Sequence, residues 1–158
     1  MTTPMGVIEG FCGPMWTWQE RRQLVHTLSP HGYGFYLSAP KADAFLRRKW
    51  RQPHPPAMSS ALPEFSRFCG HEGMRFGVGL SPFEIFNRFD GDARAALSGK
   101  LSLLERIGID ELAILFDDMR ADTPDLAVTQ VEIVHWIREH TTIKHLSVCP
   151  SYYSDDPV

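Results

Sequence analysis

Two adjacent aspartates, Asp117 and Asp118, directly follow a run of mostly apolar residues at 111–116. Neighbouring side chains on a strand point to opposite faces, so both carboxylates can serve one pocket only where the strand ends. Two carboxylates held close in a partly dry site repel each other, and one of them can stay protonated near neutral pH. A protonated carboxyl group is what general acid catalysis requires. The pair therefore predicts acid–base chemistry at the end of a strand.

Two other functions of the aspartate pair stay open. An Asp-Asp sequence after a strand could bind a divalent metal, or one aspartate could cap the following helix. Asp122 and Thr123, which stand directly before Pro124, offer that helix a cap of their own. This alternative cap favours chemistry over capping for Asp117 and Asp118.

Other candidate residues stand where neighbouring strands are expected to end, and ligands of α/β folds bind at the carboxyl ends of strands. Lys41 could hold a substrate hydroxyl or carbonyl, although an exposed loop lysine is the simpler interpretation. Gly10 could let a ligand approach the backbone, or it could serve a tight turn. Tyr153 could line a sugar pocket or pack in the core, and Cys149 fits a small buried hydrophobe.

The segments that must position these residues alternate between strand and helix. Short apolar runs predict strands at 6–13, 33–38, 75–80, 111–116 and 144–149. A capping box at 17–20 predicts a helix that ends near Gly32, and residues 62–71 predict a weak helix. Apolar residues at helical spacing predict a third helix that ends at Gly108, and a fourth helix is expected to begin at 122–124. Residues 42–58, which hold several prolines, are expected to form a long loop with room for one short helix.

This alternation predicts a parallel sheet covered by helices, an α/β fold. The order fits either a doubly wound sheet or part of a (β/α)8 barrel. A complete barrel usually needs ~250 residues, and the chain has 158. No Gly-x-Gly-x-x-Gly follows the first strand, which disfavours nucleotide binding.

The composition limits the partners. With 43% hydrophobic and 22% charged residues and a formal charge of -3, the chain is typical of a globular protein and indicates neither a nucleic acid nor a membrane partner. The three widely spaced cysteines do not suggest a disulfide framework, and the seven scattered histidines show no metal-binding spacing. Because the histidines are scattered, we expect no bound metal. The N-terminus lacks the basic region and the long apolar run of a leader sequence, so we expect a cytoplasmic protein.

Five short motifs resemble those of one enzyme family and occur in the same order. They are GVIEGFCGPMW at 6–16, APKAD at 39–43 with Trp50, Arg51 and Pro53 after it, GLSP at 79–82, LFDDM at 115–119 and CPSYY at 149–153. Each motif alone is modest, but the five together are highly specific. The chain resembles glycoside hydrolase family 84, which contains O-GlcNAcase and bacterial β-N-acetylglucosaminidases.

The resemblance implies a TIM (β/α)8 barrel, of which residues 1–158 would form the N-terminal half of one catalytic domain, with about five strands and four helices. The first and fifth strands would then be open edges. We also expect the inward faces of Val7, Phe35, Val78 and Ile114 to lack an opposite wall. The chain is therefore expected to self-associate or to pair with a complementing second half-barrel.

The resemblance also implies hydrolysis of terminal β-linked N-acetylglucosamine from a glycoconjugate or oligosaccharide, with retention of configuration and without a cofactor. The 2-acetamido oxygen of the substrate would attack the anomeric carbon and form an oxazoline, an exception to the scheme with a carboxylate nucleophile. Asp117 would polarise the acetamido group, and Asp118 would be the general acid and then the general base. The implied substrate-binding residues are Gly10, Lys41, Cys149 and Tyr153.

In this family-based interpretation Lys41 and the Gly10 carbonyl hold sugar hydroxyls, and Tyr153 contacts the acetamido region. Two positions depart from the family pattern: Cys12 stands in place of a tyrosine, and Tyr152 in place of a glutamate. Neither is a catalytic carboxylate, so the implied mechanism is unaffected while the affinity for the sugar stays open. The alternative function is a non-catalytic half-barrel that binds sugar or a partner subunit.

Overall fold

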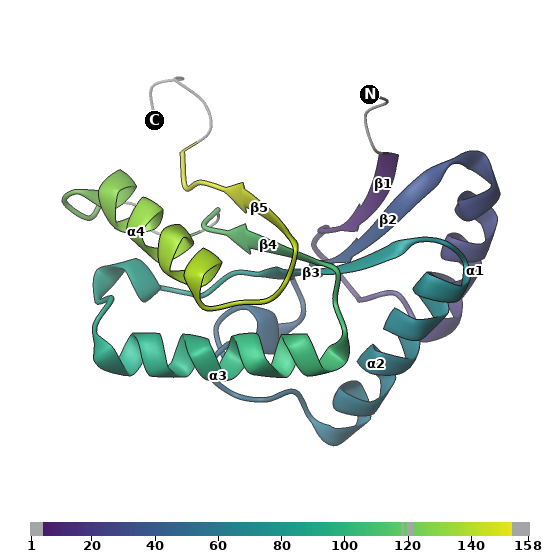
Figure 1. Ribbon diagram of the computed structural model, residues 1–158, viewed down its shortest axis with the longest axis horizontal. Coiled ribbons are helices and arrows are strands. Elements are labelled where there is room, and N and C mark those ends of the chain that lie inside the picture. Colours follow the sequence, from purple (N-terminus) through teal and green to yellow (C-terminus); the bar gives the residue numbers. More distant parts are fainter. Residues whose placement is uncertain (1–4, 118, 120–121, 153–158) are drawn as a thin grey trace.

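A parallel sheet forms the framework of the molecule. The computed structural model describes residues 5–117, 119 and 122–152, and within them five parallel strands are hydrogen-bonded in chain order. The strands are β1 (Met5–Glu9), β2 (Tyr33–Ser38), β3 (Arg75–Leu80), β4 (Glu111–Leu115) and β5 (His145–Cys149) (Figure 1). This order confirms the predicted α/β class and places the carboxyl ends of all these strands at one edge.

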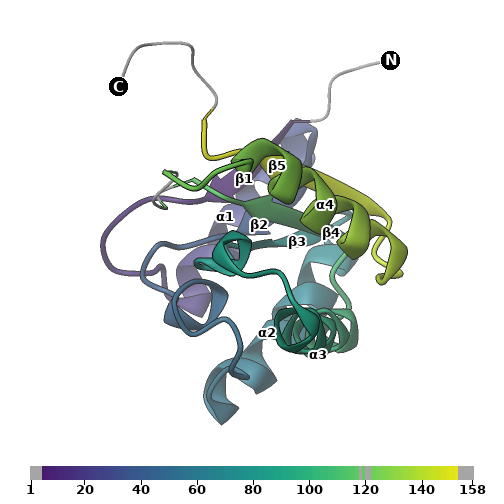
Figure 2. The same cartoon turned by 90° about the vertical axis from the view of Figure 1, so that its left-hand side faces the viewer.

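Helices connect the strands and cover one face of the sheet. In the described part of the chain they are α1 (Trp18–Leu28), α2 (Pro56–His71), α3 (Gly91–Ile107) and α4 (Leu126–Glu139), with the short 3-10 helices η1 (Ser29–His31), η2 (Ala44–Leu46) and η3 (Ile85–Asn87). Figure 2, in which α3 is viewed nearly along its axis, shows α2 and α3 on the same side of the strands. All four α-helices contribute buried side chains to a single hydrophobic core with the sheet.

Alternate residues of the strands fill the core beneath the helices. The ring centroids of Tyr36 and Phe76 lie 5.2 and 5.3 Å from that of Phe65 in α2. Val78 and Ile114 are fully buried in the same core. Val7, which is paired with Tyr36, packs against this core as well. The expectation that Val7, Val78 and Ile114 face the inside of the barrel is therefore wrong. A strand that is apolar along its whole length does not reveal which alternate set of residues faces the helices.

Small residues line the middle of the opposite face of the sheet. A Cβ atom on Gly77 would lie 2.6 Å from Cδ1 of Leu37, and one on Gly79 would lie 2.5 Å from Cβ of Ala39. Side chains of β2 and of the residue after it therefore occupy the space over these glycines, and both Leu37 and Ala39 are buried. On this face of the sheet, which lies opposite the helices, the side chains of one strand pack directly over the glycines of its neighbour.

The ends of α1 and α3 agree with the sequence patterns. The Thr17 hydroxyl accepts a hydrogen bond from the Glu20 N–H at 3.2 Å, and the Glu20 carboxylate accepts one from the Thr17 N–H at 2.7 Å. These reciprocal bonds confirm the predicted capping box. Helix α3 ends at Gly108, whose φ of 80° is the left-handed conformation that favours glycine at this position.

Helix α2 begins earlier than predicted. The sequence predicts a loop up to residue 58 and a weak helix only from residue 62, whereas the helix runs from Pro56 through Pro63 to His71. A proline in the first turn has no intrahelical hydrogen bond to lose, so Pro56 starts the helix rather than preventing it. The prolines of this segment therefore do not exclude a helix, and the predicted loop is too long.

Helix α4 begins later than predicted. Its N-cap residue is Asp125, with φ 55° and no capping hydrogen bond from its side chain. The Thr123 hydroxyl instead donates to the side chain of Asn87 at 3.2 Å. The proposal that Asp122 or Thr123 caps this helix is therefore wrong.

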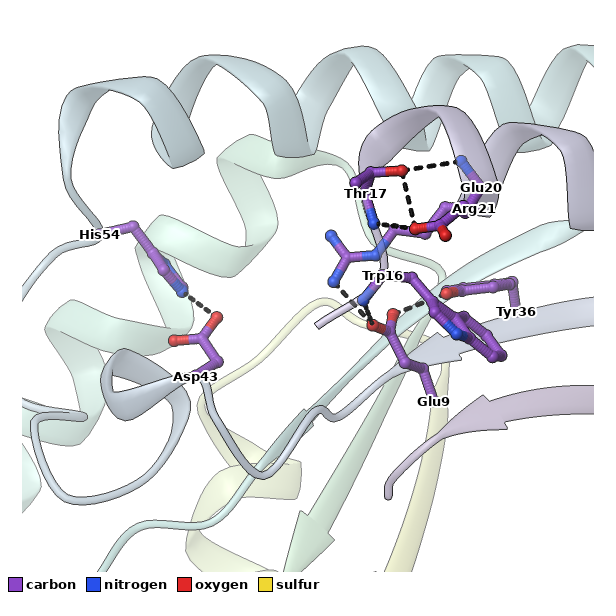
Figure 3. Close-up of polar contacts among 8 residues, drawn as sticks. All are labelled: Glu9, Trp16, Thr17, Glu20, Arg21, Tyr36, Asp43 and His54. Carbon is purple, nitrogen blue, oxygen red and sulfur yellow. Dashed lines mark hydrogen bonds and ion pairs between the residues drawn. The ribbon is translucent and has the colours of Figure 1, made fainter. Parts of the chain in front are cut away.

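A buried lysine anchors the loop that follows β2. Nζ of Lys100 in α3 donates to the carbonyl oxygens of Phe45 at 3.1 Å and Gln52 at 2.7 Å. The buried carboxylate of Asp43 accepts from the Phe45 N–H and lies 2.9 Å from Nε2 of His54 (Figure 3). Burial lowers the pKa of Lys100 to about 8. Charged groups inside the protein thus hold the loop that leaves the sheet edge.

Replacement of Gly79 tests the fit between neighbouring strands. The added methyl group would lie 2.5 Å from Ala39 and 2.9 Å from Leu115, so Gly79→Ala is expected to lower the free energy of unfolding by about 1–3 kcal/mol. Gly99→Ala in α3 is the matched control, because nothing described lies within 4 Å of its new methyl group. That change should raise stability by about 0.5–1 kcal/mol. Chemical denaturation measures both, and equal stabilities would contradict the packing account.

The buried Lys100 predicts a pH dependence of stability. Between its pKa of about 8 and the ordinary value of 10.5 the unfolded chain binds more protons at this residue than the folded chain. The contribution of Lys100 to stability must therefore rise with pH through this window. Chemical denaturation at several pH values should show wild type gaining stability relative to Lys100→Met as the pH rises from 8 to 10. Parallel pH profiles would contradict the assignment.

Candidate functional site

An ion pair joins the residues that follow β2 and β4. Nζ of Lys41 donates to Oδ2 of Asp117 at 2.7 Å. The two side chains are 15% and 21% exposed, so the pair is shielded by the protein and still accessible to a ligand. Lys41 is therefore not an exposed loop lysine, and the structure brings two of the predicted site residues into direct contact.

The second carboxylate oxygen of Asp117 is buried without a donor. Oδ1 has no hydrogen-bond partner among the residues that the structure describes. A buried acceptor left without a partner costs about 1–3 kcal/mol. A ligand N–H or O–H that reached this oxygen would recover that cost. Asp117 is thus held through one oxygen while the other remains an acceptor.

The pairing of β1 with β2 continues past both strand ends and brings Gly10 to the same edge. The Ala39 N–H donates to the carbonyl of Glu9 at 3.0 Å, and the Lys41 N–H donates to the carbonyl of Phe11 at 3.3 Å. Gly10 lies between these two acceptors in the chain. The predicted residues Gly10, Lys41 and Asp117 therefore share one edge of the sheet.

Two of the three glycines of the first motif, Gly10 and Gly13, have different explanations. Gly13 has a φ of 115°, a conformation that side chains disfavour, so the turn itself requires glycine there. A Cβ atom on Gly10 would make an ordinary contact with Cγ2 of Ile8 at 3.5 Å. Packing among the described residues does not require glycine at position 10, so ligand approach at Gly10 stays a prediction.

A hydrogen-bonded chain from α4 fixes the ends of β4 and β5. The Phe116 N–H donates to the Cys149 carbonyl at 2.8 Å, and the Phe116 carbonyl accepts from the Ser151 hydroxyl at 2.7 Å. The buried Gln130 amide donates to the same hydroxyl at 2.6 Å. Because Phe116 precedes Asp117, these bonds fix the backbone next to the candidate carboxylate. The sequence analysis missed this role, although a glutamine on an apolar helix face was a usable signal.

The remaining predicted residues are less closely defined. Asp118 and Tyr153 lie outside the described residues. Cys149 is half-buried, and Tyr152 is exposed. Among the described side chains, no group of three or more His, Cys, Asp or Glu residues is placed to hold a metal ion. None of the helices in the described ranges has the length and apolar content that a membrane crossing requires.

Comparisons with known proteins agree with this geometry. The family model described as beta-N-acetylglucosaminidase matches residues 5–157. The chain is similar to protein O-GlcNAcase from Rattus norvegicus and from Mus musculus, with 28% identity over 114 residues, or 72% of this chain. It spans 12% of the length of each of these curated relatives.

Two solved structures have a similar fold. An O-GlcNAc hydrolase variant from Thermobaculum terrenum matches 98% of this chain and 36% of its own, with a TM-score of 0.84 and 24% identity. CpGH84B matches 95% of this chain and 27% of its own, with a TM-score of 0.85 and 28% identity. The strands thus correspond to part of a (β/α)8 barrel, not to a doubly wound sheet. The resemblance to glycoside hydrolase family 84 is confirmed, and the chain belongs to the β-N-acetylglucosaminidase family.

Proposed function

We propose that residues 1–158 form the N-terminal half of a catalytic barrel that hydrolyses terminal β-linked N-acetylglucosamine from glycoconjugates or oligosaccharides. The reaction retains configuration, with the 2-acetamido oxygen as nucleophile and an oxazoline as intermediate. The family match and the O-GlcNAcase relatives support this substrate class. The proposed reaction uses no metal or organic cofactor. A cytoplasmic location is part of the proposal and can be tested by cell fractionation.

The orientation of Asp117 is the observation that carries the proposal. Lys41 holds Oδ2 at 2.7 Å, while Oδ1 is buried and has no partner in the described part of the chain. An acetamido N–H can donate to Oδ1, which increases the electron density on the acetamido oxygen as it attacks the anomeric carbon. The carboxylate also stabilises the positive charge that develops on the acetamido group during ring closure.

Asp118 is the proposed general acid. It protonates the glycosidic oxygen in the first step and takes a proton from the water that opens the oxazoline in the second. Lys41 and the Gly10 carbonyl bind sugar hydroxyls, Tyr153 contacts the acetamido region, and Cys149 belongs to the same substrate-binding set. The roles of Asp118 and Tyr153 rest on their positions in the sequence motifs.

Substitution of each aspartate separates the two roles, in a protein that contains residues 1–158 together with the remaining barrel strands. Asp118→Asn removes the proton donor, so substrates with poor leaving groups should lose about 10²–10⁴-fold in rate. Aryl glycosides with good leaving groups should lose much less in the glycosylation step. Asp117→Asn should slow both substrate classes, because it weakens the attack of the acetamido group. Pre-steady-state and steady-state rates on both classes measure these effects.

Asp92→Asn, on the exposed start of α3, is the matched control and should leave both rates near wild type, because Asp92 belongs to none of the candidate site residues. Equal losses on both substrate classes for Asp118→Asn would show that Asp118 is not the acid. Turnover of a substrate that lacks the acetamido group would contradict the substrate-assisted mechanism.

Exposed apolar side chains support association with a further chain. Within the described residues β1 is paired with β2 alone and β5 with β4 alone. Ile8 on β1 is 60% exposed and Val148 on β5 is 44% exposed. A groove of about 310 Å³, whose lining includes Val131, Val134 and Val148, lies between α4 and β5. These surfaces favour the alternative of a half-barrel that binds a second copy or a complementing half-barrel.

Residues 1–158 alone are expected to be inactive and to self-associate or aggregate. The two open edges invite pairing with other chains, and the sugar would lack ligands from the rest of the barrel. Light scattering together with an aryl N-acetylglucosaminide assay measures both properties. A monodisperse monomer that turns over substrate at normal rates would contradict this expectation.

A further inference from the structure

A buried carboxylate, Glu9, stands directly before Gly10 at the end of β1 (Figure 3). Its Oε1 accepts from Nη2 of Arg21 at 2.8 Å and from the Trp16 N–H at 3.3 Å, and its Oε2 accepts from the Tyr36 hydroxyl at 2.6 Å. Burial and this bond raise the pKa of Tyr36, so its hydroxyl stays protonated and donates. Both oxygens of Glu9 are therefore held by donors from α1, from the segment before it and from β2.

Glu9 is connected to both ends of an exposed segment, residues 11–15. Residues 11–15 are all exposed. The backbone of Glu9 leads into this segment. At the other end of the segment, the backbone N–H of Trp16 donates to the Glu9 carboxylate. The rings of Phe11 and Trp16 also lie 4.9 Å apart, which closes the segment into a loop. Gly10 joins β1 to this loop, so its position depends on Glu9.

The same loop is bonded to the residues that follow β2. The carbonyls of Glu9 and Phe11 accept from the N–H groups of Ala39 and Lys41, at 3.0 and 3.3 Å. A shift of the loop would therefore move the backbone of Lys41. The long, flexible side chain of Lys41 can keep its 2.7 Å bond to Asp117 while the backbone shifts, so Asp117 itself need not move.

Stability alone is a poor explanation for charges in this place. A buried ion pair such as Glu9–Arg21 is often no better for stability than apolar residues of the same volume. A carboxylate with both oxygens bonded, by contrast, restricts the backbone around it to one arrangement. The contacts of Glu9 thus fit a role in placing its neighbours.

We infer that Glu9 is a positioning residue of the sugar site, which holds Gly10 and Lys41 at the sheet edge beside Asp117 without touching the sugar itself. The inference rests on the proposed function for the identity of the ligand and on the hydrogen bonds of Glu9 for the positioning. Loss of these bonds should weaken sugar binding and leave the chemical step of Asp117 and Asp118 nearly unchanged.

Hydrogen exchange tests the positioning without substrate. Tyr36→Phe removes one bond to Glu9 and keeps the ring, so the peptide that contains the Ala39 and Lys41 amides should exchange about tenfold faster. Glu9→Gln should have a larger effect on the same peptide. Glu20→Gln is the matched control, because that exposed carboxylate bonds Thr17 and should leave exchange at 39–41 unchanged.

Steady-state kinetics tests the consequence for the sugar, in a protein that includes the remaining barrel strands. Tyr36→Phe should raise KM for an aryl N-acetylglucosaminide about tenfold and change kcat by less than about twofold. A merely structural role would speed exchange across the whole sheet, including β3, and would leave KM unchanged.

Unchanged exchange at 39–41 in both variants, or a wild-type KM in Tyr36→Phe, would overturn the inference. A wild-type protein without glycosidase activity would instead refute the proposed function. In that case exchange at 39–41 still decides whether Glu9 holds the sheet edge.

Discussion

The parallel pairing of β1 with β2 continues beyond both strands, and the candidate site depends on this continuation. Backbone hydrogen bonds from Ala39 and Lys41 to Glu9 and Phe11 keep the two chain segments side by side after the sheet has ended. Gly10 and Lys41 are thereby placed at one edge, and Lys41 reaches across to Asp117. Parallel strands all end on the same side of a sheet, so residues far apart in sequence meet there without any special loop.

Buried charged groups bond to the loops that leave that edge. Glu9 and Arg21 lie under the first loop, and Lys100 holds the loop after β2. Burying such groups costs free energy that their hydrogen bonds only offset. Their common consequence is to fix loop backbone, which a catalytic site needs because small displacements of binding groups reduce rates strongly.

The sequence predicted the strands well, because short apolar runs between glycine or proline turns, alternating with amphipathic stretches, are typical of a parallel sheet. It did not reveal that Val78 and Ile114 face the helices, because a strand that is apolar along its whole length lacks the polar–apolar alternation that distinguishes its two faces. Proline was given too much weight at α2. Asp117 and Lys41 were predictable from the strand ends and motifs, whereas the positioning by Glu9 was not, because its partners Arg21 and Tyr36 are brought to it only by the fold.

The proposed mechanism requires that Oδ1 of Asp117, which has no hydrogen-bond partner among the described residues, receives the acetamido group. A crystal structure of a protein that contains residues 1–158 and the remaining barrel strands, with N-acetylglucosamine bound, tests this claim most directly. The proposed mechanism predicts the acetamido nitrogen within hydrogen-bond distance of Asp117 Oδ1, and sugar hydroxyls at Lys41 Nζ and the Gly10 carbonyl. A sugar bound elsewhere, or an acetamido group turned away from Asp117, would contradict it.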